Sequence, residues 1–341
     1  MASNDHRVFV AEFDELDAAT LTALTQAHPY SDYRRYRTMP VPGAEAYFAE
    51  RIGQAAARPG TIRLLARDRS DDRPAGLMLV QSIPEDSELL GLSMAGIPAL
   101  LVRADHPAPR RVLRGLLDSL PFVVQREGFD HVSVRTDSAD IAAYQELTDA
   151  QFRLVETMVS MAYDTARRGA GELDPKEFGF DGAVRPVEAK DIDAIADLSA
   201  KSFTLNRYHL DEDIPAKDAG TLMARWARSY CEDALRGDEA DHQVWVAEGP
   251  GGEMAGYLGH QLNRALQKHT EVLVSGRALL AVGDQRSRVG QMLSRAHTWA
   301  SRGDYKEADT QLNNYGMIKV AFNLDMDMVR TKYTFHRSFL R

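Results

Sequence analysis

A strand–turn–helix stretch late in the chain constrains the fold more than any other feature. The apolar run 278–282 predicts a strand, the polar segment 284–290 predicts a turn, and the amphipathic pattern of 290–302 predicts a helix. Backbone amides at the start of such a helix, beside Arg286 and Arg288, form a binding site for an anion. The two arginines could instead simply be solvated. The stretch therefore predicts an α/β fold with an anion-binding loop at the end of a strand.

The length and composition of the chain restrict its class. A chain of 341 residues exceeds the usual size of one domain, so two domains are expected, each with its own core. Hydrophobic residues make up 44% and charged residues 27%, which are ordinary globular values and exclude disordered and collagen-like classes. The single cysteine, Cys231, excludes an intramolecular disulfide and disfavours a cysteine-based zinc site, and no metal is predicted.

Charge and hydropathy bear on partners and location. The formal net charge is −9, which argues against a nucleic-acid partner because such proteins usually present a basic face. No apolar run approaches the ~20 residues of a membrane span, and the first residues lack the order of a secretion signal. We therefore expect a cytoplasmic protein with no membrane partner, in which a local basic patch holds any anionic ligand. Whether it forms a homodimer stays open.

The segment 30–37 interleaves tyrosines with arginines. Such side chains stack on rings and bind phosphate, so the segment could form a substrate or nucleotide surface. A packed loop whose long side chains reach solvent explains the same composition and is the favoured interpretation.

The order of the expected elements repeats along the chain, although few amino acids are identical. Three segments of the first half pair with segments of the second half: 112–117 with 288–293, 132–147 with 308–323, and 152–163 with 328–339. Residues 166–182 contain several glycines and few apolar side chains, which is typical of a linker. We therefore predict a first domain over residues 1–165, a linker over 166–182 and a second domain over 183–341.

The order of elements, with a loop after the apolar strand, resembles the fold of the GCN5-related N-acetyltransferases (GNATs). Residues 285–290 match the family motif Gln/Arg-x-x-Gly-x-Gly/Ala at Gln285 and Gly290, with Arg288 at the position of the first glycine. The resemblance implies an α/β fold of two tandem GNAT-like domains, each a mixed, mostly antiparallel sheet flanked by helices. It also implies that the loop binds the pyrophosphate of acetyl-CoA, the co-substrate of the family.

The resemblance extends to the residues that would hold acetyl-CoA. The strand, the loop and the first helical residues would supply backbone amides, and Asn314 resembles the asparagine that opens the next helix and contacts CoA. Asn314 also fits a helix N-cap, and both roles can hold together. The residues assigned to cofactor binding are Ala281, Val282, Gln285, Arg286, Ser287, Arg288, Val289, Gly290, Gln291 and Asn314.

The family's usual general acid is absent. A tyrosine that often protonates the departing thiolate follows the asparagine in the family, and Ala321 stands at its position here. Tyr315, Tyr333 and His336 are the nearby substitutes, each of which a structural role would also explain. Tyr333 is the preferred general acid.

Two short segments resemble amino-sugar N-acetyltransferases of the TDP-fucosamine type: residues 207–211, with the sequence Arg-Tyr-His-Leu-Asp, and residues 86–91, with the sequence Asp-Ser-Glu-Leu-Leu-Gly. His209 and Asp211 could deprotonate an ammonium group or orient a sugar, and could equally well pin the loop between two helices. Glu271 is a weaker candidate for the general base.

The first copy departs further from the motif. In the alignment of the halves, Pro109 replaces Gln285 and Arg114 replaces Gly290, so an amide donor is lost and a bulky side chain takes the place of glycine. We predict that this copy does not bind CoA. The whole sequence predicts an N-acyltransferase that moves an acetyl or short acyl group from acyl-CoA to a small-molecule amine, such as an amino sugar or a natural-product intermediate. The alternative is a non-catalytic CoA-binding or interaction protein with a GNAT fold.

Overall fold

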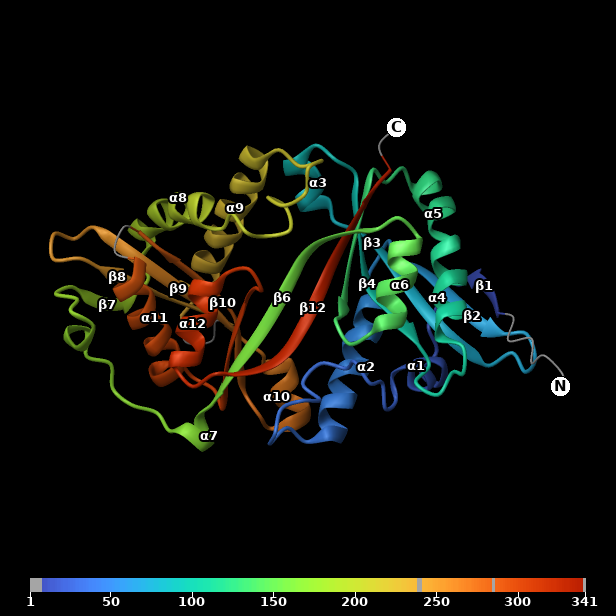
Figure 1. The fold of residues 1–341 in the computed structure, drawn as a ribbon, viewed down its shortest axis with the longest axis horizontal. Coiled ribbons are helices and arrows are strands. Elements are labelled where there is room, and N and C mark those ends of the chain that lie inside the picture. The colour runs from blue at the N-terminus through green and yellow to red at the C-terminus, as the bar shows by residue number, and fades with distance from the viewer. Residues whose placement is uncertain (1–7, 238–240, 284–285, 340–341) are drawn as a thin grey trace. The chain divides into compact units, whose positions relative to one another are not determined.

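A computed structural model describes residues 8–237, 241–283 and 286–339, apart from the side chains of residues 277, 278, 286, 287 and 300 (Figure 1). The chain divides into two compact units, of which the first combines Met1–Thr157 with Thr331–Arg341 and the second is Met158–Arg330. The first unit is therefore made of two separate pieces of chain.

The strands of the first unit lie in the order β1-β2-β3-β4-β5-β12. Neighbouring strands are antiparallel except β4 and β5, which are parallel. The strands are β1 (Val8–Glu12), β2 (Ile62–Asp68), β3 (Pro74–Ser82), β4 (Met94–Val102), β5 (His131–Asp137) and β12 (Asp327–Ser338). The helices are α1 (Ala18–Thr25), α2 (Val41–Ala57), α3 (Pro84–Leu90), α4 (Pro109–Asp118), α5 (Leu120–Glu127) and α6 (Ile141–Asp149).

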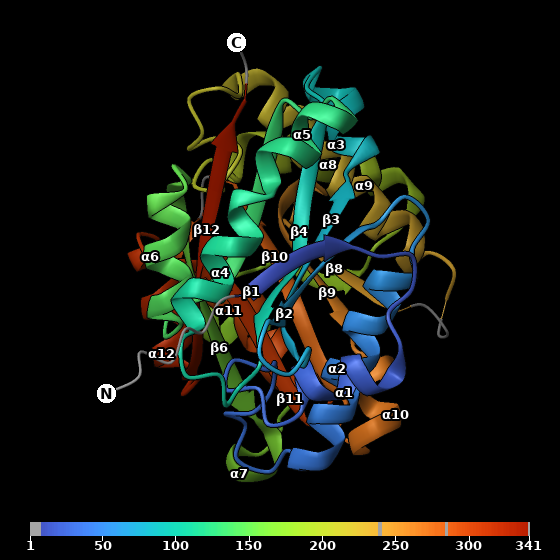
Figure 2. The ribbon, with the colours of Figure 1, turned by 90° about the vertical axis from the view of Figure 1, so that its right-hand side faces the viewer.

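Successive side chains of the first sheet point alternately to its two faces and pack into two hydrophobic cores. Leu77 and Leu79 of β3 pack with Phe48 of α2 on one face, whereas Met78 and Val80 pack under α4 and α5 on the other. Figure 2 shows α4, α5 and α6 on one side of this sheet and α1 and α2 on the other. Because helices cover both faces of the sheet, its central strands are apolar at almost every residue.

One local prediction for the first unit is confirmed, and one helix boundary has a clear cause. The apolar helical stretch divides at Ser119 into α4 and α5, because Pro121 lies in the first turn of α5 and has no N–H for an intrahelical bond. In the segment 30–37, the ring of Tyr33 lies 5.3 Å from that of Tyr36 and 5.8 Å from that of Tyr47, so the segment is a packed loop.

The strands of the second unit lie in the order β6-β11-β10-β9-β8-β7, and only β10 and β11 are parallel neighbours. The strands are β6 (Arg153–Asp164), β7 (Ala183–Pro186), β8 (His242–Glu248), β9 (Met254–Leu262), β10 (Val274–Val282) and β11 (Tyr305–Gln311). The α-helices are α7 (Thr165–Arg168), α8 (Ile192–Ser202), α9 (Ala216–Ala234), α10 (Arg264–Thr270), α11 (Arg286–Ala300) and α12 (Tyr315–Asn323), and the 3-10 helices are η1 (Pro175–Phe178) and η2 (Ala189–Asp191).

The second sheet is also covered on both faces. Val246 and Tyr257 pack with α8 and α9, whereas Leu258 packs with Met292 and Leu293 of α11. Residues 166–182, expected as the linker, contain the end of α7 and all of η1, and Phe180 packs into the core beside α11. The segment is therefore part of the second unit. The boundaries predicted for the two sequence copies stay a prediction, because compact units and repeat copies need not coincide.

The last strand of each sequence copy pairs in the unit built mainly from the other copy. Residues Met158–Asp164 of β6 pair antiparallel with β11 of the second unit. Residues Lys332–Ser338 of β12 pair antiparallel with β5 of the first unit. Strand β6 follows α6 of the first copy and completes the second unit, whereas β12 follows α12 of the second copy and completes the first unit.

The lengths of the elements repeat between the copies. Strands β3 and β9 each contain nine residues, as do β4 and β10. Helices α6 and α12 each contain nine residues, and strands β6 and β12 each contain twelve. The same elements follow in the same order in both halves, which supports the repeat that the sequence predicts. The predicted pairings of 132–147 with 308–323 and of 152–163 with 328–339 are shifted by two residues, because β5 and β11, α6 and α12, and β6 and β12 each begin 174 residues apart.

A matched pair of glycines fixes the alignment of the two copies. A Cβ atom added at Gly76 of β3 would lie 2.5 Å from Cγ1 of Val112, and one added at Gly256 of β9 would lie 3.0 Å from Cγ1 of Val289. Each valine is the fourth residue of its helix, α4 or α11. Leu113 therefore corresponds to Gly290. The sequence alignment that paired Arg114 with Gly290 and Pro109 with Gln285 is wrong by one residue.

The close approach of α11 to β9 can be tested by substitution. We expect Gly256→Ala to destabilise the second unit by ~1–3 kcal/mol, because the new methyl group would lie 2.8 Å from the carbonyl oxygen of Ala281. Urea denaturation followed by tryptophan fluorescence measures this, since Trp226, Trp245 and Trp299 all lie in the second unit. Gly290→Ala is the matched control, because a Cβ there meets only ordinary contacts among the described residues. Equal stability for Gly256→Ala and the unchanged protein would contradict the packing.

No helix within the described parts of the chain is long and apolar enough to cross a membrane.

Candidate cofactor and acyl-transfer site

The expected anion-binding loop joins β10 to α11 in the second unit. The helix begins at Arg286, four residues before the position expected from the amphipathic pattern, so Gly290 lies in the second turn and not at the helix start. Gln285 lies outside the described residues, and the side chains of Arg286 and Ser287 are also outside them. The first turn of α11 begins four residues after Val282, the last residue of β10.

Strand β10 has a bulge opposite His260. Gly276 pairs with Gln261 and Leu279 pairs with Gly259, so two residues of β10 face one residue of β9. Strand β10 pairs with β11 only at Val274 and Ser275. Among the fully described residues, no register pair joins the two parallel strands beyond Ser275. The stretch 277–282 expected to offer amides to a ligand is thus the stretch where the strands separate.

The protein leaves room at Gly290. The nearest described atom to a Cβ built there is Cγ1 of Val282, at 3.9 Å, which is an ordinary contact. The backbone of Gly290 is helical, so no positive φ requires glycine at this position. A reason for glycine within the described structure is therefore lacking, whereas a ligand that approaches the helix backbone would supply one.

The other residues assigned to the cofactor have different surroundings. Ala281 is buried with the α8 and α9 core, and Val282 and Val289 contact the core under α11. Gln291 is exposed. Arg288 is exposed, and its guanidinium lies against Gly179 at the end of η1, since a Cβ there would be 3.3 Å from Nη1.

Asn314 caps α12, as expected. Its Oδ1 accepts a hydrogen bond from the N–H of Met317 at 3.3 Å, and its Nδ2 donates to Oγ1 of Thr310 at 3.0 Å. Because β10 and β11 are parallel, the helices that follow them both begin at the same edge of the sheet. Asn314 therefore lies at the sheet edge where α11 also starts.

The loop that carries His209 and Asp211 is held by its own side chains. Oδ1 of Asn206 accepts hydrogen bonds from the N–H groups of Tyr208 and His209, at 2.9 and 3.2 Å. Oδ1 of Asp211 accepts one from the N–H of Asp213 at 3.0 Å. Burial lowers the pKa of His209. These contacts support the loop-pinning role, and a catalytic role for either residue stays a prediction.

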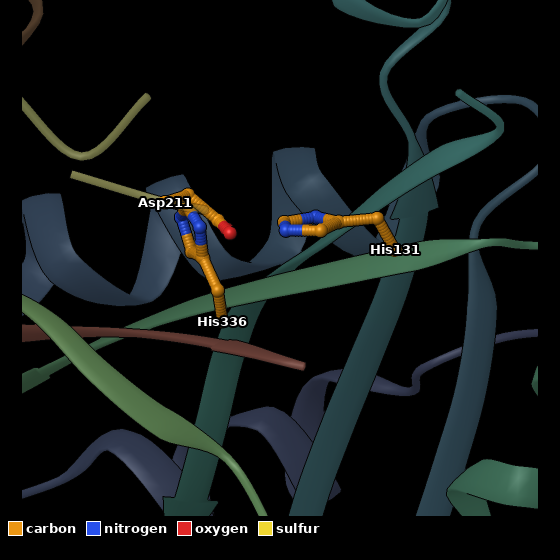
Figure 3. A group of neighbouring side chains, drawn as sticks. All are labelled: His131, Asp211 and His336. Atoms are coloured by element: carbon orange, nitrogen blue, oxygen red, sulfur yellow. The ribbon is translucent and has the colours of Figure 1, made fainter. Parts of the chain in front are cut away.

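Tyr333 and His336 lie in the first unit, because the end of β12 belongs there. The ring of Tyr333 lies 5.5 Å from that of Tyr144 on α6. The imidazole of His336 meets that of His131 edge to face, with centroids 4.6 Å apart, and both rings are fully buried (Figure 3). Asp211, also drawn in Figure 3, belongs to the second unit. The structure thus shows packing roles for both candidate acids of β12.

Two further residues bear on the missing general acid: Ala321, at the position of the family's tyrosine, and Tyr315, a possible substitute. Ala321 is fully buried on α12 and offers no proton, whereas Tyr315 is 77% exposed at the first position of that helix.

Comparisons with known proteins rest on structure alone, since the sequence matches no protein-family model and no curated protein. A tandem GNAT protein from the clavulanic acid biosynthesis pathway matches with a TM-score of 0.51 and 12% identity, over 97% of this chain and 98% of its own. A GCN5-related N-acetyltransferase from Sphaerobacter thermophilus matches with a TM-score of 0.55 and 12% identity, over 85% of each chain.

A third structure matches nearly all of this chain but less than half of its own length. The GCN5-related glucosamine N-acetyltransferase region of a fungal multi-domain β-N-acetylglucosaminidase matches with a TM-score of 0.62 and 11% identity, over 97% of this chain and 38% of that one. The chain has a tandem GNAT fold. At these identities the likeness concerns the fold, and the amino-sugar subtype expected from residues 207–211 is not shown by it.

The first GNAT copy keeps the bulge but not the features around it. Strands β4 and β5 pair at four positions, from Met94 to Ile97, where β10 and β11 pair at two. Pro98 lies in the bulge of β4, between Gly96 and Ala99, and has no N–H to donate. Leu113 is buried where α11 has Gly290. The first copy is therefore poorly suited to hold a ligand along this strand.

The second GNAT copy contains an acidic residue that the sequence analysis missed. Ala308 of β11 packs with α12, so Glu307 points to the opposite face of the sheet. A Cβ built on Gly276 would lie 2.5 Å from Oε2 of Glu307, which places this carboxylate at the point where β10 and β11 separate. No motif or residue spacing in the sequence identifies Glu307. To find it one must know which face of β11 each residue takes, and this depends on the strands and helices that pack against β11.

Proposed function

We propose that the chain transfers an acyl group from acyl-CoA to the amine of a small polar metabolite, with the second copy as the catalytic one. The observation that carries the proposal is the separation of β10 from β11 at a bulge, followed by a helix whose Gly290 has no packing reason to be glycine among the described residues. The tandem GNAT fold supports it. Acetyl is the simplest acyl group, and an amino sugar remains one candidate acceptor.

The residues of the second copy fit CoA. The amides of the first turn of α11 would hold the diphosphate, because a helix N-terminus favours negative charge. Arg286 and Arg288 add positive charge on the same turn. Asn314, at the sheet edge where α11 starts, would reach the pantetheine or adenosine part.

CoA, when bound, supplies the acyl group as a reactive thioester. The N–H groups at the bulge of β10 would stabilise the negative charge that develops on the carbonyl oxygen during attack. Glu307, which lies beside this bulge, would take a proton from the acceptor's ammonium group, directly or through water, so that the free amine attacks the thioester. The group that protonates the leaving thiolate stays a prediction, with Tyr333 preferred and His209 and Asp211 as candidates on the acceptor side.

The acidic face of β11 favours a cationic acceptor. Asp309 lies two residues after Glu307 and therefore shares its face of the sheet. Oδ1 of Asp309 is buried and has no hydrogen-bond partner among the described residues. Two carboxylates on one strand attract an ammonium group, which is the charged form of an amine.

Glu307→Gln tests the proton acceptor. We expect kcat to fall by about 10²- to 10⁴-fold, because the amide cannot take up a proton, while the affinity for acetyl-CoA stays within twofold. Stopped assays of free thiol release against the active amine measure kcat, and calorimetry measures binding. Asp325→Asn, at an exposed side chain of the second unit, is the control and should leave kcat unchanged. An unaltered kcat for Glu307→Gln would remove Glu307 from the mechanism.

The alternative is a protein that binds CoA without catalysis. Ala321 favours it, because a fully buried methyl group stands where the family places a proton donor. Isothermal titration with acetyl-CoA, followed by thiol release against a broad panel of amines, separates the two functions. Binding with turnover supports the transferase, binding without turnover on every amine supports the alternative, and absence of binding rejects both.

A further inference from the structure

A cluster of polar side chains is buried between α11 and the second sheet. It consists of Ser275 on β10, His260 on β9, Lys306 on β11, and Ser294 and His297 on α11, which we call the α11 polar cluster. None of the five residues is more than 4% exposed. The rings of His260 and His297 are 5.2 Å apart, and Ser275 is the register partner of Lys306. A polar group in this position must be satisfied by a partner or it costs stability.

Four atoms of the α11 polar cluster have no hydrogen-bond partner within the described structure. They are the hydroxyl oxygens of Ser275 and Ser294 and the Nδ1 atoms of His260 and His297. Nε2 of His297 donates to the carbonyl oxygen of Glu307 at 3.0 Å, and Nε2 of His260 lies 2.9 Å from Oε1 of Gln243. A hydrogen bond at Nε2 thus fixes the orientation of each imidazole ring, and Nδ1 is left for a further partner.

Lys306 gives the cluster a positive charge. Its Nζ donates to Oγ1 of Thr165 at 2.9 Å and to the carbonyl oxygen of Gly303. Burial lowers its pKa to about 8, so the amine is still mostly protonated at neutral pH. Both hydrogen-bond acceptors are uncharged, and the positive charge therefore has no carboxylate bonded to it in these contacts.

The residues of the first copy that correspond to the α11 polar cluster are all apolar. The corresponding residues are Val80 on β3, Ala95 on β4, Val132 on β5, Leu117 on α4 and Leu120 at the start of α5. All five belong to one hydrophobic core cluster. The same places in the fold therefore come together as an apolar core in one copy and as hydroxyl, imidazole and ammonium groups in the other. Packing alone does not require polar side chains there.

The α11 polar cluster lies where an acyl chain would end. Ser275 and Lys306 form the last register pair before β10 and β11 separate, and His260 lies opposite the bulge of β10. In the proposed function, the thioester reaches the bulge from the edge where α11 starts. An acyl chain longer than acetyl would extend from the bulge toward the paired ends of the two strands.

We propose that the α11 polar cluster binds a carboxylate at the far end of a dicarboxylic acyl group carried by CoA. The inference rests on the proposed acyl-CoA site and names its substrate more closely. A carboxylate accepts hydrogen bonds from both serine hydroxyls and neutralises Lys306. Nδ1 of each ring is an acceptor while Nε2 donates, and it stays unprotonated because burial and the charge of Lys306 lower the pKa of His260 and that of His297, the latter to about 4. The carboxylate would then give both serine hydroxyls a partner.

The test compares three CoA thioesters by isothermal titration of the full chain: acetyl-CoA, butyryl-CoA and succinyl-CoA. Butyryl and succinyl groups have the same chain length, and only succinyl carries a carboxylate. We expect succinyl-CoA to bind at least tenfold more tightly than butyryl-CoA. In Ser275→Ala and Ser294→Ala, which introduce no bulk, the ratio of the two affinities should fall to threefold or less. The same variants should keep or raise the melting temperature without ligand, because each removes a buried hydroxyl that lacks a partner.

Ser199→Ala is the matched control, since Ser199 is fully buried on the opposite face of the same sheet and bonds to Tyr257. It should keep the tenfold ratio. If butyryl-CoA binds as tightly as succinyl-CoA, or if free succinate alone binds as well as succinyl-CoA, the inference is overturned while the acyl-CoA site stands. If none of the three thioesters binds, the proposed function fails and the inference fails with it.

Discussion

Gly290→Trp should weaken acetyl-CoA binding by about 100-fold or more, a loss of ~2.7 kcal/mol. The indole would cover the helix backbone at the point where α11 follows β10, and the amides of the first turn could no longer approach a diphosphate. Calorimetric titration of the full chain measures the loss. Gly290 is buried, so circular dichroism and a thermal melt must first show that the variant keeps the fold.

Gly290→Ala makes the test independent of bulk. Alanine in a helix interior is more stable than glycine by ~0.5–1 kcal/mol, so the melting temperature should rise while the affinity for acetyl-CoA falls. Opposite changes in stability and affinity are the signature of a glycine kept for a ligand. Arg111→Trp places the same indole at an exposed position of α4 in the first copy and should change neither quantity. Unchanged affinity in Gly290→Trp would show that α11 does not form the cofactor loop.

Phe335→Ala should destabilise the first unit by ~3–5 kcal/mol, although Phe335 belongs by sequence to the second copy. The ring is 1% exposed and packs in the core of the first unit, because β12 pairs with β5. Hydrogen exchange gives the cleanest measurement. Amides of β5 should lose protection in the variant, whereas those of β8 and β9 in the second unit should keep theirs.

Phe322→Ala is the control for this exchange of strands. Phe322 lies on α12 and is 49% exposed, so its loss should change stability by no more than ~0.5 kcal/mol. Loss of protection in β8 and β9 but not in β5 on replacement of Phe335 would contradict the pairing of β12 with the first unit.

Much of the fold follows from local patterns. The strand expected at 278–282 and the helix expected at 290–302 appear as β10 and α11 with boundaries shifted by a few residues, because their apolar spacing is regular. Helices α3 and α10 were missed, since seven residues are too few to show a helical period. The cap formed by Asn263, whose Oδ1 accepts from the N–H of Leu266, was the one available sign of α10.

The exchange of β6 and β12 could not be predicted from sequence. Both strands contain twelve residues and follow a nine-residue helix, so either would fit beside either parallel neighbour. Pattern and length specify that a strand forms, and the choice of partner depends on side-chain packing across the sheet.

The site divides in the same way. Gly290 and Asn314 could be proposed from sequence because the family motif and the helix cap are short, contiguous patterns. Glu307 and the α11 polar cluster could not, because the face that each residue of β9, β10 and β11 takes depends on which strands pair and on which helices cover them. Sequence spacing alone does not give this pairing, and so it could not show that polar side chains from four elements meet under α11.

The exchange of β6 and β12 also bears on how long a degenerate copy can survive in evolution. A duplicated domain that has lost its ligand is ordinarily free to be deleted, since the remaining copy still folds. Here, deletion of the first copy would remove β6 from the second unit and leave the edge of β11 without its partner. If the first copy binds no CoA, as we predict, the second unit would still need its strand β6. An intact second unit therefore requires both halves of the chain.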